Sequence, residues 1–93
     1  MKSHSELEID RPQRWAKQVS NHLGHKAELK EEATKYLLTF GFGASAQVSW
    51  SDSAVLMDIE AETPEALEKA KQVVGGHLLR FAKLDQTHDL TWS

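Results

Sequence analysis

The chain has 93 residues, of which 40% are hydrophobic and 27% are charged, with a formal net charge of −3 and no cysteine. This length suits one domain with one core. The apolar runs are far shorter than the roughly 20 residues that span a bilayer, and the start of the chain lacks the apolar stretch of a secretory signal. We therefore expect a single cytoplasmic domain over residues 1–93. The negative charge disfavours nucleic acid as a partner, and the missing thiols leave only nitrogen and oxygen ligands for any metal.

The first segment predicts a short strand followed by a helix. Leu7 and Ile9 alternate with acidic residues, as in a strand with one buried and one solvent-facing side. Asp10 and Gln13 have the spacing of a capping box, and Pro12 falls in the first turn, where its missing N–H is not needed. A helix is therefore expected to start here.

This helix is expected to run to about Leu23. Trp15, Val19 and Leu23 follow i, i+4 spacing and form its apolar side. Gly24 predicts a left-handed stop immediately after it. The same helix carries a small basic strip formed by Arg11, Arg14 and Lys17.

Four strands are predicted next from the alternation of apolar and polar residues. Turn-forming sequences separate them at residues 31–34, 41–43 and 51–53. The apolar sides of the strands carry Ala27 and Leu29; Tyr36, Leu38 and Phe40; Ala44, Ala46, Val48 and Trp50; and Val55, Met57, Ile59 and Ala61. Such alternation is typical of an antiparallel sheet that is covered on one side.

A second helix has the clearest signals, because Thr63 is a good cap and Pro64 suits the first position. Its apolar stripe consists of Leu67, Ala70, Val74, Leu78 and Phe81. The pair at residues 75–76 is Gly-Gly, which is unfavourable inside a helix and indicates close packing or a bend; a ligand approaching the backbone is the alternative. A last strand is expected at residues 90–92.

The order β-α-β-β-β-β-α-β predicts a two-layer α+β domain in which both helices cover the same face of an antiparallel sheet. Trp15, Trp50 and Trp92 fall on sides that the alternation assigns to the core. For Trp50, which lies beside a hairpin turn, the alternative is partial exposure as part of a contact surface.

Two segments carry a family resemblance: Asn-His-Leu-Gly-His-Lys at residues 21–26 and His-Leu-Leu-Arg-Phe-Ala at residues 77–82, together with Leu-Thr-Trp at 90–92. With them the chain resembles a small bacterial family of unknown function, some of whose members are associated with siderophore-interacting flavoprotein reductases. The resemblance implies a fold similar to the C-terminal domain of phosphohexomutases, a TATA-binding-protein-like arrangement. It implies no activity, and Leu23 stands where the family typically has an aromatic residue.

The candidate site residues are His22, His25 and His77, with Arg80 as a further ligand-binding candidate. Both predicted helices cover one sheet face, so the three imidazoles could converge and bind a transition-metal ion or another ligand. The favoured alternative is structural: His22 and His25 bind the free carbonyls at the helix end, and His77 donates to the backbone at the core margin.

Other polar residues are interpreted as structural or solvated. Arg80 is expected to pair with Asp85 or Glu68 or to stabilise the end of its helix. His4 and His88 are expected to be exposed, with no nucleophile beside them.

Three functions therefore remain open. The leading hypothesis is a non-enzymatic binding or accessory domain, and the resemblance alone links it to iron or siderophore handling. The second is a protein-interaction or self-associating module that uses a sheet edge or the open sheet face. The third is a small metal-dependent enzyme, although the sequence carries no complete catalytic set.

Overall fold

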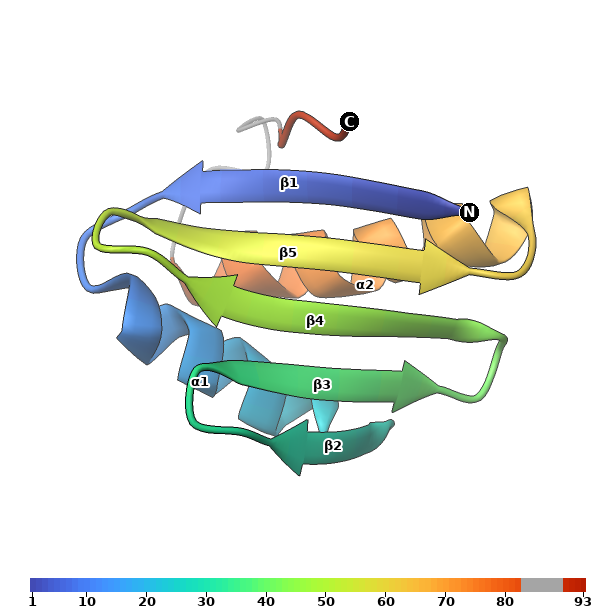
Figure 1. Ribbon diagram of the computed structural model, residues 1–93, viewed down its shortest axis with the longest axis horizontal. Helices are drawn as coiled ribbons and strands as arrows, with labels where there is room; N and C mark the ends of the chain where they lie inside the picture. The colour runs from blue at the N-terminus through green and yellow to red at the C-terminus, as the bar shows by residue number, and fades with distance from the viewer. Residues whose placement is uncertain (83–89) are drawn as a thin grey trace.

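The computed structural model describes residues 1–82 and 90–93, and within them a five-stranded sheet carries two helices on one face (Figure 1). The elements are β1 Lys2–Glu8, α1 Pro12–Leu23, β2 Glu28–Glu31, β3 Lys35–Phe40, β4 Ala44–Trp50, β5 Ala54–Ala61 and α2 Pro64–Phe81. The strand order is β1-β5-β4-β3-β2, and every neighbouring pair is antiparallel. The predicted α+β class with both helices on one side is confirmed.

Strand β1 begins earlier than the apolar alternation predicts. Its inward side carries Ser3, Ser5 and Leu7, while Ile9 lies beyond the strand. Both serine hydroxyls donate to backbone carbonyls near the C-terminus, Ser3 to Ser93 at 3.0 Å and Ser5 at 2.9 Å to the carbonyl of residue 91. Small hydroxyl side chains are buried here because they find partners, a possibility that apolar periodicity does not detect.

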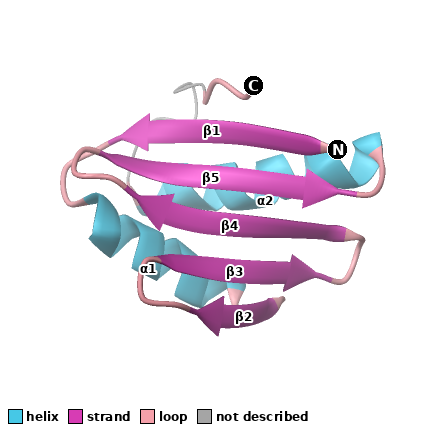
Figure 2. Cartoon of the chain, in the orientation of Figure 1, coloured by secondary structure: helices cyan, strands magenta, loops and turns pink. Residues whose placement is uncertain are grey.

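The predicted last strand is present as an extended segment without regular strand geometry. Residues 90–93 lie along β1, at the edge of the sheet in Figure 2. His4 and Ser93 exchange two backbone hydrogen bonds, of 3.2 and 2.9 Å. This segment therefore pairs with the β1 edge at His4.

The core lies between the sheet and the two helices. Each helix contributes a stripe of almost fully buried residues: Ala16, Val19 and Leu23 from α1, and Ala70, Val74 and Leu78 from α2. The three tryptophans, Trp15, Trp50 and Trp92, are partly exposed and pack against the margin of this core. The three tryptophans thus lie on the core side, as predicted, but at the margin of the core and not in its interior.

The predicted capping box at the start of α1 is wrong. Arg11 occupies the capping position with a left-handed backbone (φ 56°, ψ 55°), and no side chain caps the helix. Pro12 is the first helical residue, as expected. Asp10 contributes its backbone carbonyl, which accepts a hydrogen bond from Nε1 of Trp15 at 3.0 Å. The Trp15 indole thus binds the backbone just before the helix, and the side chains of Asp10 and Gln13 form no capping box.

Two glycines act through their lack of a side chain. Gly24 ends α1 with a right-handed backbone (φ −60°), so the predicted left-handed stop is wrong. Gly75 sits inside α2 in close contact with the C-terminal segment: a Cβ there would lie 2.8 Å from Cδ1 of Leu90 and 3.3 Å from Cζ2 of Trp92. Close packing, the expected reason for a glycine at this position, is confirmed, and α2 continues through it without a break.

Candidate functional site

Two of the three candidate histidines come together where the ends of the helices meet. His22 lies in the last turn of α1, and His77 lies one turn before the end of α2. Their ring centres are 5.2 Å apart with an angle of 36° between the planes. Phe81 packs edge-on against His22, with ring centres 4.9 Å apart. The structure thus joins two imidazoles that are separated by 55 positions in the chain.

His25 lies near this pair but is not part of it. Its ring centre is 6.5 Å from that of His22, in an edge-on arrangement. It follows the end of α1, and together with Lys26 and Phe40 it lines a separate open hollow of about 530 Å³. His25 is therefore a neighbour of the imidazole pair that lies beyond the end of α1.

The surroundings of His22 lower its pKa below the usual 6.5. The first cause is desolvation, because the ring packs against His77 and Phe81 although the residue as a whole is exposed. The second cause is the positive charge of nearby groups, in decreasing order of effect His77, His25, Lys26 and Arg80. At neutral pH the His22 ring is consequently uncharged and keeps a free nitrogen lone pair.

His77 is oriented by the backbone of its own helix. Its Nδ1 lies 2.6 Å from the carbonyl oxygen of Val73, and since a carbonyl only accepts, Nδ1 carries the proton and donates it. This is the backbone contact that the structural interpretation expected for His77. When the ring is neutral, the same contact leaves Nε2 as its acceptor nitrogen, and Nε2 is one of the two ring nitrogens through which histidines bind metals.

The carbonyls at the end of α1 are satisfied by the backbone and not by imidazoles. The N–H groups of Gly24, His25 and Lys26 donate to the carbonyls of residues 20, 22 and 23 at 2.9, 3.2 and 3.0 Å. Among the described residues the rings of His22 and His25 make no such bond, so the expected capping role of these two side chains is wrong. Their rings remain available at the surface.

A complete metal centre is not assembled within residues 1–82 and 90–93. No three or more His, Cys, Asp or Glu side chains in this part of the chain are placed to hold one ion. Of the predicted set of His22, His25 and His77, the two rings that lie closest together are those of His22 and His77.

Arg80 completes the positive surroundings of the imidazole pair. It lies in the last turn of α2, where a cation interacts favourably with the negative helix end, as expected. The expected pairing with Glu68 is wrong, because Glu68 lies 12 positions earlier on the same helix, about 18 Å away at 1.5 Å per residue. The other expected partner, Asp85, lies outside the described residues, as does His88.

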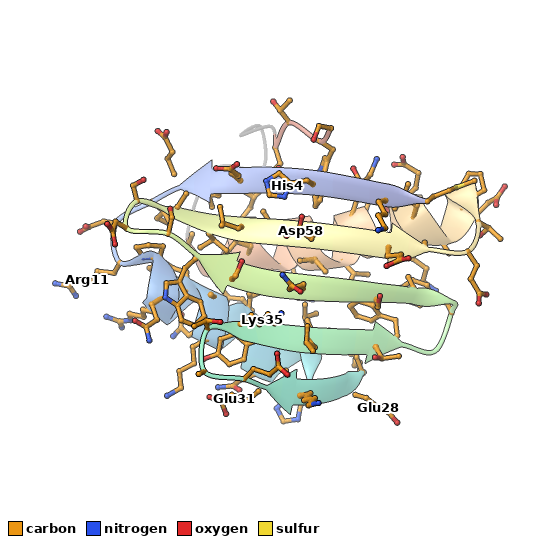
Figure 3. The ribbon with its side chains drawn as sticks, in the orientation of Figure 1. His4, Arg11, Glu28, Glu31, Lys35 and Asp58 are labelled. Atoms are coloured by element: carbon orange, nitrogen blue, oxygen red, sulfur yellow. The ribbon has the colours of Figure 1, made fainter. Side chains whose placement is uncertain are left out.

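A further polar cluster, which the sequence did not reveal, occupies the open sheet face. His4 on β1 lies opposite Asp58 on β5, with Nδ1 2.7 Å from the Asp58 carboxylate and Nε2 3.0 Å from that of Glu6 (Figure 3). Hydrogen bonds to Glu6 and then to Asp58 raise the pKa of His4 above 6.5. His4 is partly exposed, as expected, but two carboxylates bind its ring, so it is not solvated alone. The alternation of His4 and Glu6 on one side of a strand was the available signal.

Comparison with known proteins places the chain in a family. The sequence profile of a bacterial family described as uncharacterized conserved proteins, DUF2218, matches residues 4–93. The chain belongs to this family. Both histidine segments and the C-terminal residues 90–92 lie inside the match, which confirms the family resemblance seen in the sequence. The family description assigns no activity to DUF2218 members.

A solved structure shares the fold of this DUF2218 chain. The NMR structure of PA4090 from Pseudomonas aeruginosa superposes with a TM-score of 0.81 at 23% sequence identity, covering 99% of this chain and 94% of that one. At this identity the similarity establishes the fold alone. A search of functionally curated proteins finds no match. Within the described residues, no helix of this DUF2218 member is long and apolar enough to cross a membrane.

Proposed function

We propose that this chain is a bacterial binding domain that takes a transition-metal ion on the imidazole pair of His22 and His77. Some proteins that it resembles are associated with siderophore-interacting flavoprotein reductases, which favours iron handling as the setting. The domain would then act as an accessory to metal transfer, without chemistry of its own.

The observation that carries the proposal is the 5.2 Å separation of the two ring centres. In a tetrahedral site two imidazoles lie with their ring centres about 5 Å apart, because each metal–nitrogen bond is about 2.0–2.1 Å and the ring centre lies roughly 1 Å further on. The separation therefore suits a shared ion with little rearrangement. His25, at 6.5 Å, would need to turn toward His22 to join it.

The protonation states support the same proposal. Metal binding requires neutral imidazoles, and the lowered pKa of His22 keeps it neutral at pH 7. The bond of His77 to the Val73 carbonyl orients its ring and leaves Nε2 free. In addition, the last turns of both helices meet at the pair, and the negative end of a helix dipole favours a bound cation.

The positive groups nearby favour a metal that arrives with an anionic chelator. The positive charges of Lys26 and Arg80 act on His22, and the same charges would attract carboxylate or phenolate oxygens of a chelator. Two imidazoles leave coordination positions open for such oxygens. This arrangement fits the delivery or acceptance of a chelated ion better than permanent storage of a bare one.

The test is a titration with Zn²⁺, and then with Fe²⁺ under anaerobic conditions, followed by NMR of the histidine rings and by calorimetry. We expect the ring signals of His22 and His77 to shift together. His22→Ala and His77→Ala should each weaken binding by at least about tenfold, no less than the loss of an outer-shell partner costs. His4→Ala is the matched control, because it removes an imidazole on the open sheet face. Equal binding by the parent and both single variants would refute the proposal.

The main competing proposal is protein interaction or self-association through a sheet edge. Residues 90–93 pair with β1 at His4, so the edge without a backbone partner among the described residues is β2. That strand has only four residues, three of them charged, which are the features that natural proteins use to prevent edge pairing. We therefore expect a monomer in light scattering at high concentration; a concentration-dependent dimer would favour the competing proposal.

A metal-dependent enzyme remains the third proposal. It would use the same imidazole pair, with an open position for a water molecule or substrate. Absence of metal binding in the Zn²⁺ titration removes this proposal together with the first.

A further inference from the structure

A second cleft opens at the other end of α1. It measures about 660 Å³ and lies between the first turns of α1 and the turn that joins β4 to β5. Its walls include Arg11, Arg14, Lys17, Trp50 and Asp52. Figure 3 shows Arg11 at the start of α1, at the same end of the sheet as this turn. The volume falls within the range of about 300–1,000 Å³ that small-molecule sites occupy.

The charge of this cleft is unbalanced. Arg11, Arg14 and Lys17 are all exposed, and none of them forms an ion pair with a carboxylate of the described residues. Asp52 offsets one of the three charges. The first turn of α1 contains no acidic residue, so the positive end of the helix dipole adds to the cations. In a chain with a net charge of −3, this cleft is a local positive site.

One wall of the cleft is aromatic. Trp50 ends β4 and is only partly buried, with its ring centre 5.8 Å from that of Tyr36. An indole that faces a cleft offers a flat apolar surface on which a planar ring can stack. Cations beside an indole recognise a ligand that has a charged part and a flat part.

We infer that this cleft binds a small phosphate ester carried on a planar ring, such as a mononucleotide or an aryl phosphate. Arg11 and Arg14 can each present two parallel N–H donors to phosphate oxygens, and Lys17 adds a point charge. The flat part of the ligand stacks on Trp50. A nucleic-acid polymer fits less well, because only three cations gather here and the rest of the chain is acidic. This site is independent of the imidazole pair and does not rest on the proposed metal binding.

The experiment compares AMP, inorganic phosphate and adenosine as probes, with NMR of the backbone and of the indole N–H groups. We expect AMP to bind most tightly, with shifts at Arg11, Arg14, Lys17 and Trp50, and the affinity to fall as salt rises. Arg14→Gln/Lys17→Gln should weaken AMP binding by at least about tenfold, the loss of roughly 1.4 kcal/mol. Both residues are exposed, so the variant is expected to fold normally.

Lys2→Gln/Lys69→Gln is the matched control for the loss of two charges. Lys2 begins β1, and Lys69 lies on α2 over the Phe42 ring, both remote from the cleft walls. Equal losses in the two double variants would overturn the site, because general charge attraction would then explain the binding. Phosphate that binds as tightly as AMP, with Trp50→Leu leaving AMP affinity unchanged, would overturn the stacking on Trp50. An oligonucleotide that binds more tightly than AMP through the same residues would overturn the assignment to a small ligand.

Discussion

The two helices begin in opposite ways although each has a proline at its first position. In α2, Thr63 caps the helix by accepting a hydrogen bond from the N–H of Ala66 at 3.1 Å, and Glu65 lies in the first turn. In α1, Arg11 adopts a left-handed backbone, no side chain caps the helix, and the first turn is without acidic residues. The start of α2 is thus stabilised by its own residues. The start of α1 lacks this local stabilisation, and its cations line a cleft.

Away from their starts, the two helices are equally part of the core. Leu23 of α1 and Leu78 of α2 are 1% and 0% exposed. We expect Leu23→Ala and Leu78→Ala each to lower the free energy of unfolding by about 2–5 kcal/mol, measured by urea denaturation. Leu79→Ala, at a half-buried position of α2, should cost less. A loss below about 1 kcal/mol at either leucine would show that its helix is not part of the common core.

The cap of α2 is the next largest expected effect. Thr63→Ala removes the hydrogen bond to the Ala66 N–H and should lower the free energy of unfolding by about 1 kcal/mol. For a domain of this size the melting temperature falls by roughly 4–8 °C. Thr34→Ala, in an exposed turn, is the matched control and should be nearly neutral. If the two variants melt at the same temperature, the start of α2 does not depend on its cap.

At the start of α1 the expected change has the opposite sign. Arg11→Asn places a residue that tolerates the left-handed backbone at φ 56°, so it should stabilise the protein by about 0.5–1 kcal/mol. It should also weaken AMP binding in the cleft. Arg14→Gln, which removes a charge without changing the backbone preference, should stabilise by less. A gain no greater than that of Arg14→Gln would show that the backbone of Arg11 carries no strain.

Two histidines, one near the end of α1 and one on the open sheet face, should produce small pH effects of opposite sign. The raised pKa of His4 gives a stabilising contribution that is complete below pH 6.5 and is lost as the pH rises through the folded-state pKa. The lowered pKa of His22 gives no contribution above pH 6.5 and a destabilising one as the pH falls below it.

These signs are measured by urea unfolding at about pH 5 and about pH 8.5. His4→Gln should lose stability relative to the parent mainly at the lower pH, whereas His22→Gln should gain stability there. Both effects are small because solvent screens these partly exposed groups. The same sign for both variants would contradict the assigned environments.

Much of the fold followed from local patterns. The signals of Thr63 and Pro64 placed the start of α2 correctly, and the alternation in residues 36–61 predicted β3, β4 and β5. The errors fell where polar side chains bind backbone carbonyls. Ser3 and Ser5 are buried because they bind the C-terminal segment, and α1 starts where the Trp15 indole meets the backbone. Neither contact produces a hydrophobic repeat that could be recognised in the sequence.

The residues of the candidate site were predicted from the sequence, but their arrangement was not. The sequence identified His22, His25 and His77, but not that the first and last form a pair while His25 stands beside it. It identified the basic strip of α1, but not the cleft that the strip forms with Trp50. The His4–Asp58 contact was missed entirely, because it depends on the register between two strands that are far apart in the chain.

The sequence by itself determined the family, the α+β class and most element boundaries, because hydrophobic period, proline positions and the Thr63 cap act within a few residues. The tertiary structure alone decided which polar groups meet. The packing of α1 against α2 brings two imidazoles within 5.2 Å, and the position of α1 on the sheet sets its three cations beside an indole. Both juxtapositions join residues more than 30 positions apart, and such contacts follow from packing and strand register, which no local pattern encodes.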